Sequence, residues 1–176
     1  GFNGYLNSRF FTDENQWRKR AIWGFDNRNI KTIQVSYKFK EEESFRIEIE
    51  NKQPTLFNAD RVKIENVNLS NLYEYLAAFR NTSYEGAIVE SDGIYSKMDS
   101  VKAAGEVYSV YVEPIDGDPI ELKAYRVRAM PGTFDVNDQP RIWDQDRLYG
   151  IIDNDTYVLI QNFGMQNITR SLSDFK

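Results

Sequence analysis

The sequence predicts an α+β fold in which helices pack on one face of antiparallel sheet. Three observations predict it: apolar and polar residues alternate in several stretches, short turns connect these stretches, and other segments carry apolar residues every three or four positions. Alternation with a period of two indicates a strand with one buried face, whereas the longer spacing indicates an amphipathic helix. Because short turns join antiparallel strands, we expect hairpins rather than crossover connections.

The strands are expected in hairpins along the whole chain. Ile33, Val35 and Tyr37 alternate with polar residues, and the same pattern returns after a polar turn. Asp116-Gly117 lies between two later stretches, and Asp-Gly is a strong signal for a hairpin turn. The expected strands are residues 30–39, 45–49, 56–57, 62–64, 107–112, 120–127, 148–152 and 157–160.

The clearest helix signal is a stripe of apolar residues at steps of three and four that includes Leu69, Leu72 and Leu76. An asparagine before this stripe, Asn66 or Asn68, is expected to cap the helix, because its side-chain oxygen can accept from a free backbone N–H group. The expected helices are residues 12–22, 69–79, 99–104 and 163–174.

We expect two α+β halves, residues 1–86 and 87–176, which are either separate units or parts of one globular domain. An internal repeat supports a duplication, because residues 66–72 align with residues 162–168 in both apolar and asparagine positions. The alternative is that any two amphipathic helices agree at their apolar positions. Both interpretations stay open.

The composition excludes several classes of chemistry. The chain contains no histidine and no cysteine, so histidine relays, histidine-ligated metals, thiolate nucleophiles and disulfides are excluded. Its net charge is −5 and its densest basic run is Arg18-Lys19-Arg20. Nucleic-acid binding requires extensive neutralisation of phosphates, so no nucleic-acid partner is expected. No apolar run is long enough to span a membrane, and no cofactor is expected.

Acidic residues gather near the third hairpin and suggest a calcium site, because Ca²⁺ prefers several oxygen ligands. Their spacing does not match the known calcium-binding loop, and Asp is also an ordinary residue of turns. We therefore assign no metal ligand. The acids in question are Asp135, Asp138, Asp144, Asp146, Asp153 and Asp155.

Three further groups of residues each have a functional and a structural interpretation. Asp116 and Asp118 resemble the paired carboxylates of a hydrolase, but they flank a glycine in an expected turn, which turn chemistry explains. Arg147 is expected to pair with a nearby Asp as a structural clamp. The three tryptophans either line a sugar- or peptide-binding face or belong to the core. These are Trp17, Trp23 and Trp143.

Several stretches resemble the C-terminal half of a family of uncharacterised bacterial envelope proteins. They are Gly1-Phe2-Asn3-Gly4-Tyr5-Leu6, Arg9-Phe10-Phe11-Thr12, Trp17-Arg18, Ser44-Phe45-Arg46-Ile47, Asp144-Gln145-Asp146-Arg147-Leu148-Tyr149-Gly150 and Val158-Leu159-Ile160-Gln161. That family carries a domain of unknown function related to auxiliary subunits of gliding-motility ABC transporters. The resemblance implies an extracytoplasmic location and a membrane anchor upstream of Gly1, and it supplies no activity and no binding residues.

Two further observations bear on location. Asp99-Ser100-Val101 resembles the acceptor pattern for protein O-glycosylation in some bacterial envelopes. The chain also begins at Gly1 without an initiator methionine, so we expect a fragment or a processed chain.

These observations lead to three functional hypotheses. The first is a non-enzymatic envelope domain that binds a protein partner through a sheet edge or an aromatic patch. The second is a glycan- or small-ligand-binding module with a concave site rimmed by exposed Trp and Tyr. The third is a carboxylate-dependent hydrolase, which needs two acids that converge in one cleft. We favour a non-enzymatic role with no catalytic residue.

Overall fold

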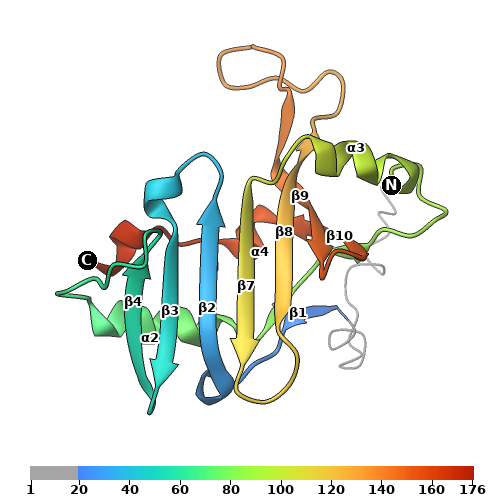
Figure 1. Cartoon of the computed structure of the whole chain (residues 1–176). Coiled ribbons are helices and arrows are strands. Elements are labelled where there is room, and N and C mark those ends of the chain that lie inside the picture. The colour runs from blue at the N-terminus through green and yellow to red at the C-terminus, as the bar shows by residue number, and fades with distance from the viewer. Residues whose placement is uncertain (1–19) are drawn as a thin grey trace, which may run out of the picture.

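An antiparallel sheet of eight strands forms the centre of the molecule, in the order β4-β3-β2-β7-β8-β9-β10-β6 (Figure 1). The computed structural model describes residues 20–176. The strands of this sheet are β2 (Ile30–Tyr37), β3 (Phe45–Glu50), β4 (Gln53–Asn58), β6 (Gly86–Ala87), β7 (Tyr108–Pro114), β8 (Ile120–Arg128), β9 (Trp143–Ile152) and β10 (Thr156–Gln161). Two short strands, β1 (Ala21–Trp23) and β5 (Thr82–Ser83), pair separately.

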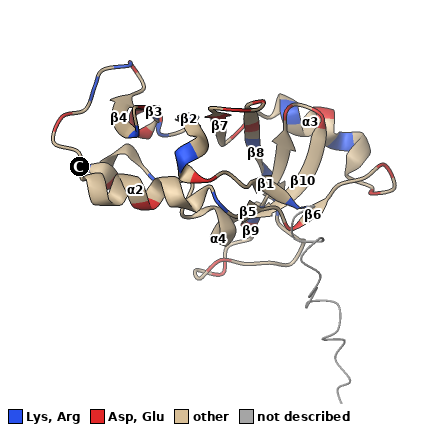
Figure 2. Cartoon of the chain, turned by 90° about the horizontal axis from the view of Figure 1, so that it is seen from below, with Lys and Arg blue, Asp and Glu red and all other residues tan. Residues whose placement is uncertain are grey.

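Helices cover parts of both faces of the sheet. The α-helices are α2 (Leu69–Ala78), α3 (Met98–Ala103) and α4 (Asn162–Met165), and the 3-10 segments are η1 (Asn27–Asn29), η2 (Glu41–Glu43), η3 (Tyr95–Lys97) and η4 (Leu172–Phe175). Figure 2 shows α2 and α4 on one side of the sheet and α3 on the other. The expected α+β class, antiparallel sheet with helices packed against it, is confirmed. Within residues 20–176, no helix has the length and apolar character needed to cross a membrane.

The main core lies between the sheet and α2. Alternation along β2 places Ile33 and Val35 on the face toward α2, where both are fully buried. The Tyr75 ring of α2 makes edge contacts with Phe45, at 5.6 Å between ring centres, and with Phe175, at 5.3 Å. Each such pair contributes about 0.5–1.5 kcal/mol beyond area burial. The aromatic cluster therefore ties the last residues of the chain to the sheet.

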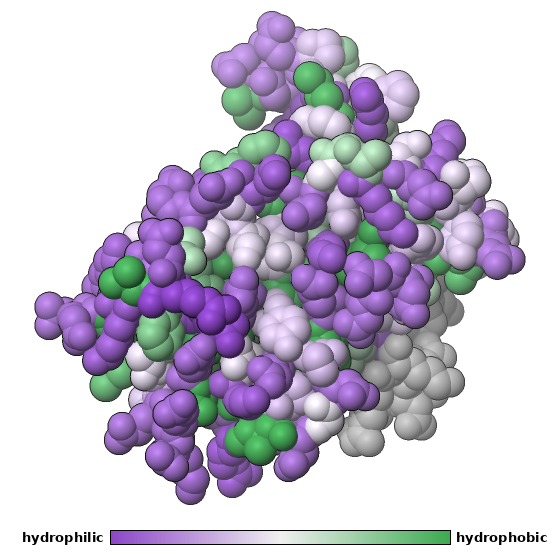
Figure 3. All heavy atoms as spheres, in the orientation of Figure 1, coloured by the Kyte–Doolittle hydropathy of each residue, from purple (hydrophilic) through white to green (hydrophobic). Residues whose placement is uncertain are grey.

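The second face of the sheet is polar over β3 and β2 and covered over β8 to β10. On the polar part, Arg46 donates to Glu48 at 2.6 Å, and Figure 3 shows a largely hydrophilic surface. On the covered part, Met98 of α3 packs with Tyr125 and Ile151 in a second, smaller apolar cluster. This cluster holds α3 over the strands that carry the candidate site.

Most of the expected elements are present. The three hairpins correspond to β2 with β3, β7 with β8, and β9 with β10. The side-chain oxygen of Asn68 accepts from the N–H group of Asn71 at 3.2 Å and caps α2, and α3 matches the expected helix at 99–104. The expected strand at 62–64 is reduced to a single bridge between Phe57 and Lys63.

The expected helix over residues 163–174 is wrong. α4 ends at Met165, where the N–H and hydroxyl groups of Thr169 both donate to the carbonyl oxygen of Met165, at 2.8 and 3.0 Å. The backbone is extended at Ser171, which then starts η4 in a capping box with Asp174. The expected helix over 12–22 is wrong at its end, because β1 occupies residues 21–23. The rest of that expectation lies outside the described residues.

Strands from both expected halves belong to the same sheet. β2 pairs with β7, and the expected boundary between residues 86 and 87 falls inside β6, which pairs with β10. The two segments related by the repeat differ in length, since α2 has 10 residues and α4 has 4. The duplication stays a prediction.

Candidate functional site

A cavity of about 630 Å³ lies between α3 and the adjoining ends of β8 and β9. We call it the α3 cavity. Its volume falls within the range of small-molecule sites, roughly 300–1,000 Å³. Its lining residues are Phe39, Ile94, Lys97, Ser100, Val101, Ala104, Gly105, Val107, Arg126, Arg128, Trp143 and Tyr149.

Arg126, near the end of β8, contacts two aromatic rings at the wall of the α3 cavity. Its guanidinium carbon lies 5.1 Å from the ring centre of Phe39 and 5.4 Å from that of Trp143. The guanidinium carbon of Arg128 lies 5.5 Å from the same Trp143 ring. Cation–π contacts at exposed sites contribute only about 0.5–1 kcal/mol each. Their main effect here is to orient the side chains that line the cavity.

A bulge between β8 and β9 places Trp143 at this position. Arg126 pairs with Leu148, whereas Arg128, two residues later in β8, pairs with Trp143, so β9 has extra residues between these two pairs. The extra residues of β9 are held by Asp144, whose Oδ1 accepts from the backbone N–H groups two and three positions later, at 2.8 and 3.1 Å. A bulge changes the direction of the side chains beside it. Asp144 therefore acts as a positioning residue for Trp143.

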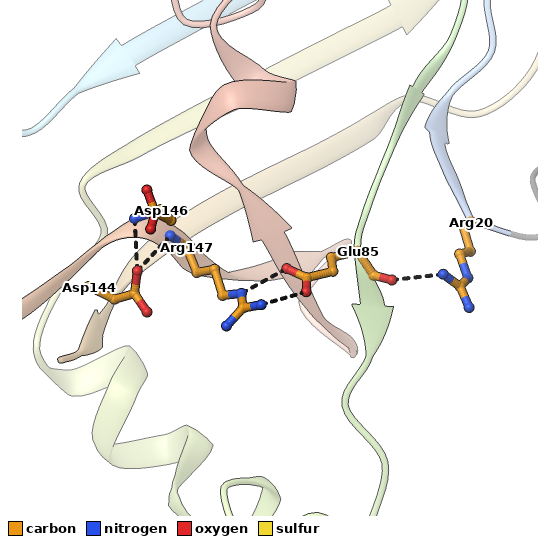
Figure 4. A network of polar contacts seen from close by, with 5 residues as sticks. All are labelled: Arg20, Glu85, Asp144, Asp146 and Arg147. Carbon is orange, nitrogen blue, oxygen red and sulfur yellow. Dashed lines mark hydrogen bonds and ion pairs between the residues drawn. The ribbon is translucent and has the colours of Figure 1, made fainter. Parts of the chain in front are cut away.

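Arg147 fixes the chain immediately after the bulge. Its Nε and Nη2 atoms donate to the two carboxylate oxygens of Glu85, each at 3.0 Å, and this pairing raises the pKa of Arg147. The carbonyl oxygen of Glu85 accepts from Arg20 at 2.9 Å. Figure 4 shows this network together with Asp144. The expected partner of the Arg147 side chain was an Asp, which is wrong, because Asp144 binds only its backbone N–H.

A second hollow of about 320 Å³ adjoins the α3 cavity and shares Phe39, Val107 and Arg126 with it. Tyr108 lines this hollow, and its hydroxyl oxygen is buried without a hydrogen-bond partner among the described residues. Burial raises the pKa of Tyr108 far above its usual value, so the hydroxyl is neutral. A buried hydroxyl without a partner costs about 1–3 kcal/mol.

The lining of the α3 cavity is basic although the chain is acidic. The lining contains Lys97, Arg126 and Arg128 and no Asp or Glu, whereas the net charge of the chain is −5. Burial raises the pKa of Tyr149, so its hydroxyl stays protonated at neutral pH. The cavity therefore offers aromatic faces, apolar surface and N–H donors, and within residues 20–176 no carboxylate lines it.

The tryptophans highlighted by the sequence have different roles. Trp143 is partly exposed and lines the α3 cavity. Trp23 is a core residue with no exposed surface, and its ring centre lies 5.4 Å from that of Phe79. Trp17 lies outside the described residues.

Three of the acids highlighted by the sequence, Asp135, Asp144 and Asp153, accept hydrogen bonds from backbone N–H groups in and around turns. Asp135 Oδ1 accepts from two backbone N–H groups at 2.8 and 2.9 Å, and Asp153 Oδ1 accepts from one at 2.8 Å. Asp116 and Asp118 flank Gly117, which has a φ of 109° in the turn between β7 and β8. In the part of the chain that the structure describes, no three His, Cys, Asp or Glu side chains are grouped to hold a metal ion.

Phe39, Arg126 and Arg128 are site residues that the sequence patterns did not reveal. A signal is present in β8, where the core face carries Leu122 and Ala124 and then continues with Arg126. A core-facing row that changes from apolar to basic residues indicates that the strand has passed the edge of the core. The aromatic contacts of these residues come from segments distant in sequence, so the pattern alone does not show them.

Comparisons with models of protein families, with curated proteins and with solved structures each found no match, so the function must be inferred from the chain's own residues.

Proposed function

We propose that this protein is a non-enzymatic binding domain whose α3 cavity takes a small molecule with a flat apolar part. The observation that carries the proposal is the position of Trp143, a partly exposed indole in a concave site. Trp and Tyr suit such a site because each combines a large apolar face with a polar atom. The envelope location and the transporter-linked assembly implied by the family resemblance stay predictions.

The walls of the cavity support a bound apolar ring. Val101 of α3 and Tyr149 of β9 line it together with Trp143, and the rings of Phe39 and Trp143 are held by Arg126. Ligand sites are typically apolar with a few placed polar groups. A hydrolase in this cavity would need two acids, and no carboxylate from the described part of the chain lines it. Binding is therefore the better use of this site.

The experiment is a fluorescence titration with N-phenyl-1-naphthylamine, a neutral aromatic dye that brightens in apolar surroundings. We expect saturable binding, about tenfold weaker in Trp143→Ala, because stacking on an aromatic face contributes about 1–3 kcal/mol. Phe163→Ala is the matched control, since it removes an exposed aromatic residue that does not line the cavity. No binding, or an equal loss in both variants, would count against the proposal.

A second candidate function is docking of a protein partner through residues 129–142, which project above the sheet between β8 and β9 (Figure 1). Backbone bonds order this projection, such as Arg141 N–H to Thr133 oxygen at 2.9 Å. Figure 3 shows hydrophobic spheres on it. The exposed apolar residues are Met130, Phe134, Val136 and Ile142. Their concentration on one ordered projection favours contact with another protein.

Docking through a sheet edge is less favoured. Beside β4, residues 62–64 cover the edge, with Ile64 N–H donating to Leu56 oxygen at 2.9 Å. Beside β10, β6 covers the other edge. Affinity capture from envelope extracts tests the projection: Val136→Asp should lose the partner, whereas Val89→Asp, which changes an exposed valine elsewhere, should keep it. Equal capture by both variants would exclude the projection as the docking surface.

A further inference from the structure

We infer that the ligand of the α3 cavity carries an oxyanion, such as a carboxylate, sulfonate or phosphate, which binds at Arg126 and Arg128. This inference rests on the proposed function, because it gives the ligand class for the same cavity. It goes further by naming the group that fixes the ligand's orientation.

The first support is that neither arginine forms an ion pair with a described carboxylate. Elsewhere in the described chain, arginines such as Arg46, Arg147 and Arg170 bond to a carboxylate at 2.6–3.0 Å. Arg126 and Arg128 have aromatic contacts, and no described carboxylate lies within ion-pair distance of either. Their positive charge is available for an anion from outside.

The second support is the way the guanidinium groups are held. Both guanidinium carbons lie within 5.5 Å of the Trp143 ring centre, so two like charges share one aromatic residue. Contact through an aromatic face leaves the N–H donors at the edge of a guanidinium plane free. An oxyanion matches that fork of donors and would offset the repulsion between the two cations.

The third support is that further basic side chains line the same wall of the cavity and the adjoining hollow. Lys97 lies on the same lining as the two arginines. Beyond Arg126, the adjoining hollow adds Lys40. Among the residues that the structure describes, the lining of these two hollows contains no carboxylate to compete for the donors. An anion near Arg126 would thus contact only positive or neutral side chains of these linings.

The test compares two dyes that differ by one anionic group. N-phenyl-1-naphthylamine is neutral, and 8-anilinonaphthalene-1-sulfonate has the same rings with a sulfonate. We expect the sulfonate to bind the whole chain at least tenfold more tightly. Arg126→Gln and Arg128→Gln should each weaken the sulfonate about tenfold, the lower end expected for a charge-assisted hydrogen bond at an exposed site. Both should weaken the neutral dye less than the sulfonate, because for that dye only the aromatic contacts that orient Phe39 and Trp143 are lost.

Arg80→Gln is the matched control, because it removes one positive charge from an exposed arginine that does not line the α3 cavity. If the two dyes bind equally, or if Arg80→Gln weakens the sulfonate as much as Arg126→Gln does, the oxyanion inference is wrong while the binding function stands. If neither dye binds, the proposed function fails and the inference fails with it. Thermal unfolding of each variant verifies that every protein compared is folded.

Discussion

Tyr75 donates its hydroxyl hydrogen to the carbonyl oxygen of Ile168 at 3.0 Å, across 93 residues of sequence. Both residues are fully or almost fully buried, so this bond joins α2 to the C-terminal segment inside the core. Tyr75→Phe should lower the free energy of unfolding by about 1–3 kcal/mol, because it leaves a buried carbonyl without its donor. Urea denaturation measures the loss.

Tyr108→Phe is the comparison for that variant. Tyr108 is also buried, but its hydroxyl has no partner among the described residues. Removing it should leave the free energy of unfolding unchanged or raise it by about 1 kcal/mol. Equal losses in Tyr75→Phe and Tyr108→Phe would show that the bond to Ile168 does not account for the effect.

Gly150 is required by the packing of the sheet rather than by its backbone conformation. A Cβ atom there would lie 2.7 Å from Val158 Cγ2 and 3.0 Å from Leu122 Cδ1. Gly150→Ala should therefore destabilise the protein by about 1–3 kcal/mol through overpacking. A Cβ atom at Gly164 would meet nothing within 4 Å. Gly164→Ala should therefore leave the free energy of unfolding unchanged or raise it by up to about 1 kcal/mol. Thermal unfolding of both variants tests the contrast, and a Gly150→Ala protein as stable as wild type would contradict it.

Stability should fall at alkaline pH. Burial raises the pKa of Tyr37, Tyr75 and Tyr108 above the value near 10 that tyrosine has in an unfolded chain. The stabilisation is complete below pH about 10 and is lost as the pH rises from there towards the folded-state pKa values, because only the unfolded chain releases these protons. Three protons give a slope of up to about 4 kcal/mol per pH unit.

Urea denaturation at a series of pH values, with tyrosinate absorbance as the second readout, measures this slope. Tyr108→Phe should reduce the slope by up to about 1.4 kcal/mol per pH unit, since it removes one of the groups that ionise only in the unfolded chain. If the native protein ionised all its tyrosines near pH 10 without unfolding, these side chains would not be buried as described.

Asp144 should affect ligand binding without touching the ligand. Its side chain holds the bulge that brings Trp143 opposite Arg128. Asp144→Ala should weaken N-phenyl-1-naphthylamine binding severalfold, with a stability loss of about 1 kcal/mol for the freed backbone groups. Asp144→Asn keeps an oxygen acceptor and should restore most of the binding. Equal binding losses in both variants would argue that the negative charge matters rather than the hydrogen bonds.

The strands could be predicted from the sequence because the alternation of apolar and polar residues shows directly which face of a strand is buried.

The wrong prediction of a helix over residues 163–174 has a physical cause. Met165, Ile168, Leu172 and Phe175 keep helical spacing and are all buried, yet the chain opens at Ser171 to start a new 3-10 turn. The capping box of Ser171 and Asp174 is a start signal within that stretch, and it outweighs the apolar stripe.

The candidate site was harder to predict than the fold. Trp143 was identified as a possible binding residue from its residue type alone. Its role depends on Arg126, on a bulge and on Phe39, which lies just after β2, and no local pattern links these segments. Site geometry of this kind arises from the pairing of distant strands, which the sequence specifies only through the whole fold.

The most direct test of the account is to follow the indole N–H signals of Trp143 and Trp23 by NMR during titration with N-phenyl-1-naphthylamine. Trp143 lines the α3 cavity and Trp23 is enclosed in the core. We predict that the Trp143 signal moves progressively and saturates while the Trp23 signal stays in place. A bound dye that leaves the Trp143 signal unmoved would contradict the assignment of the α3 cavity as the binding site.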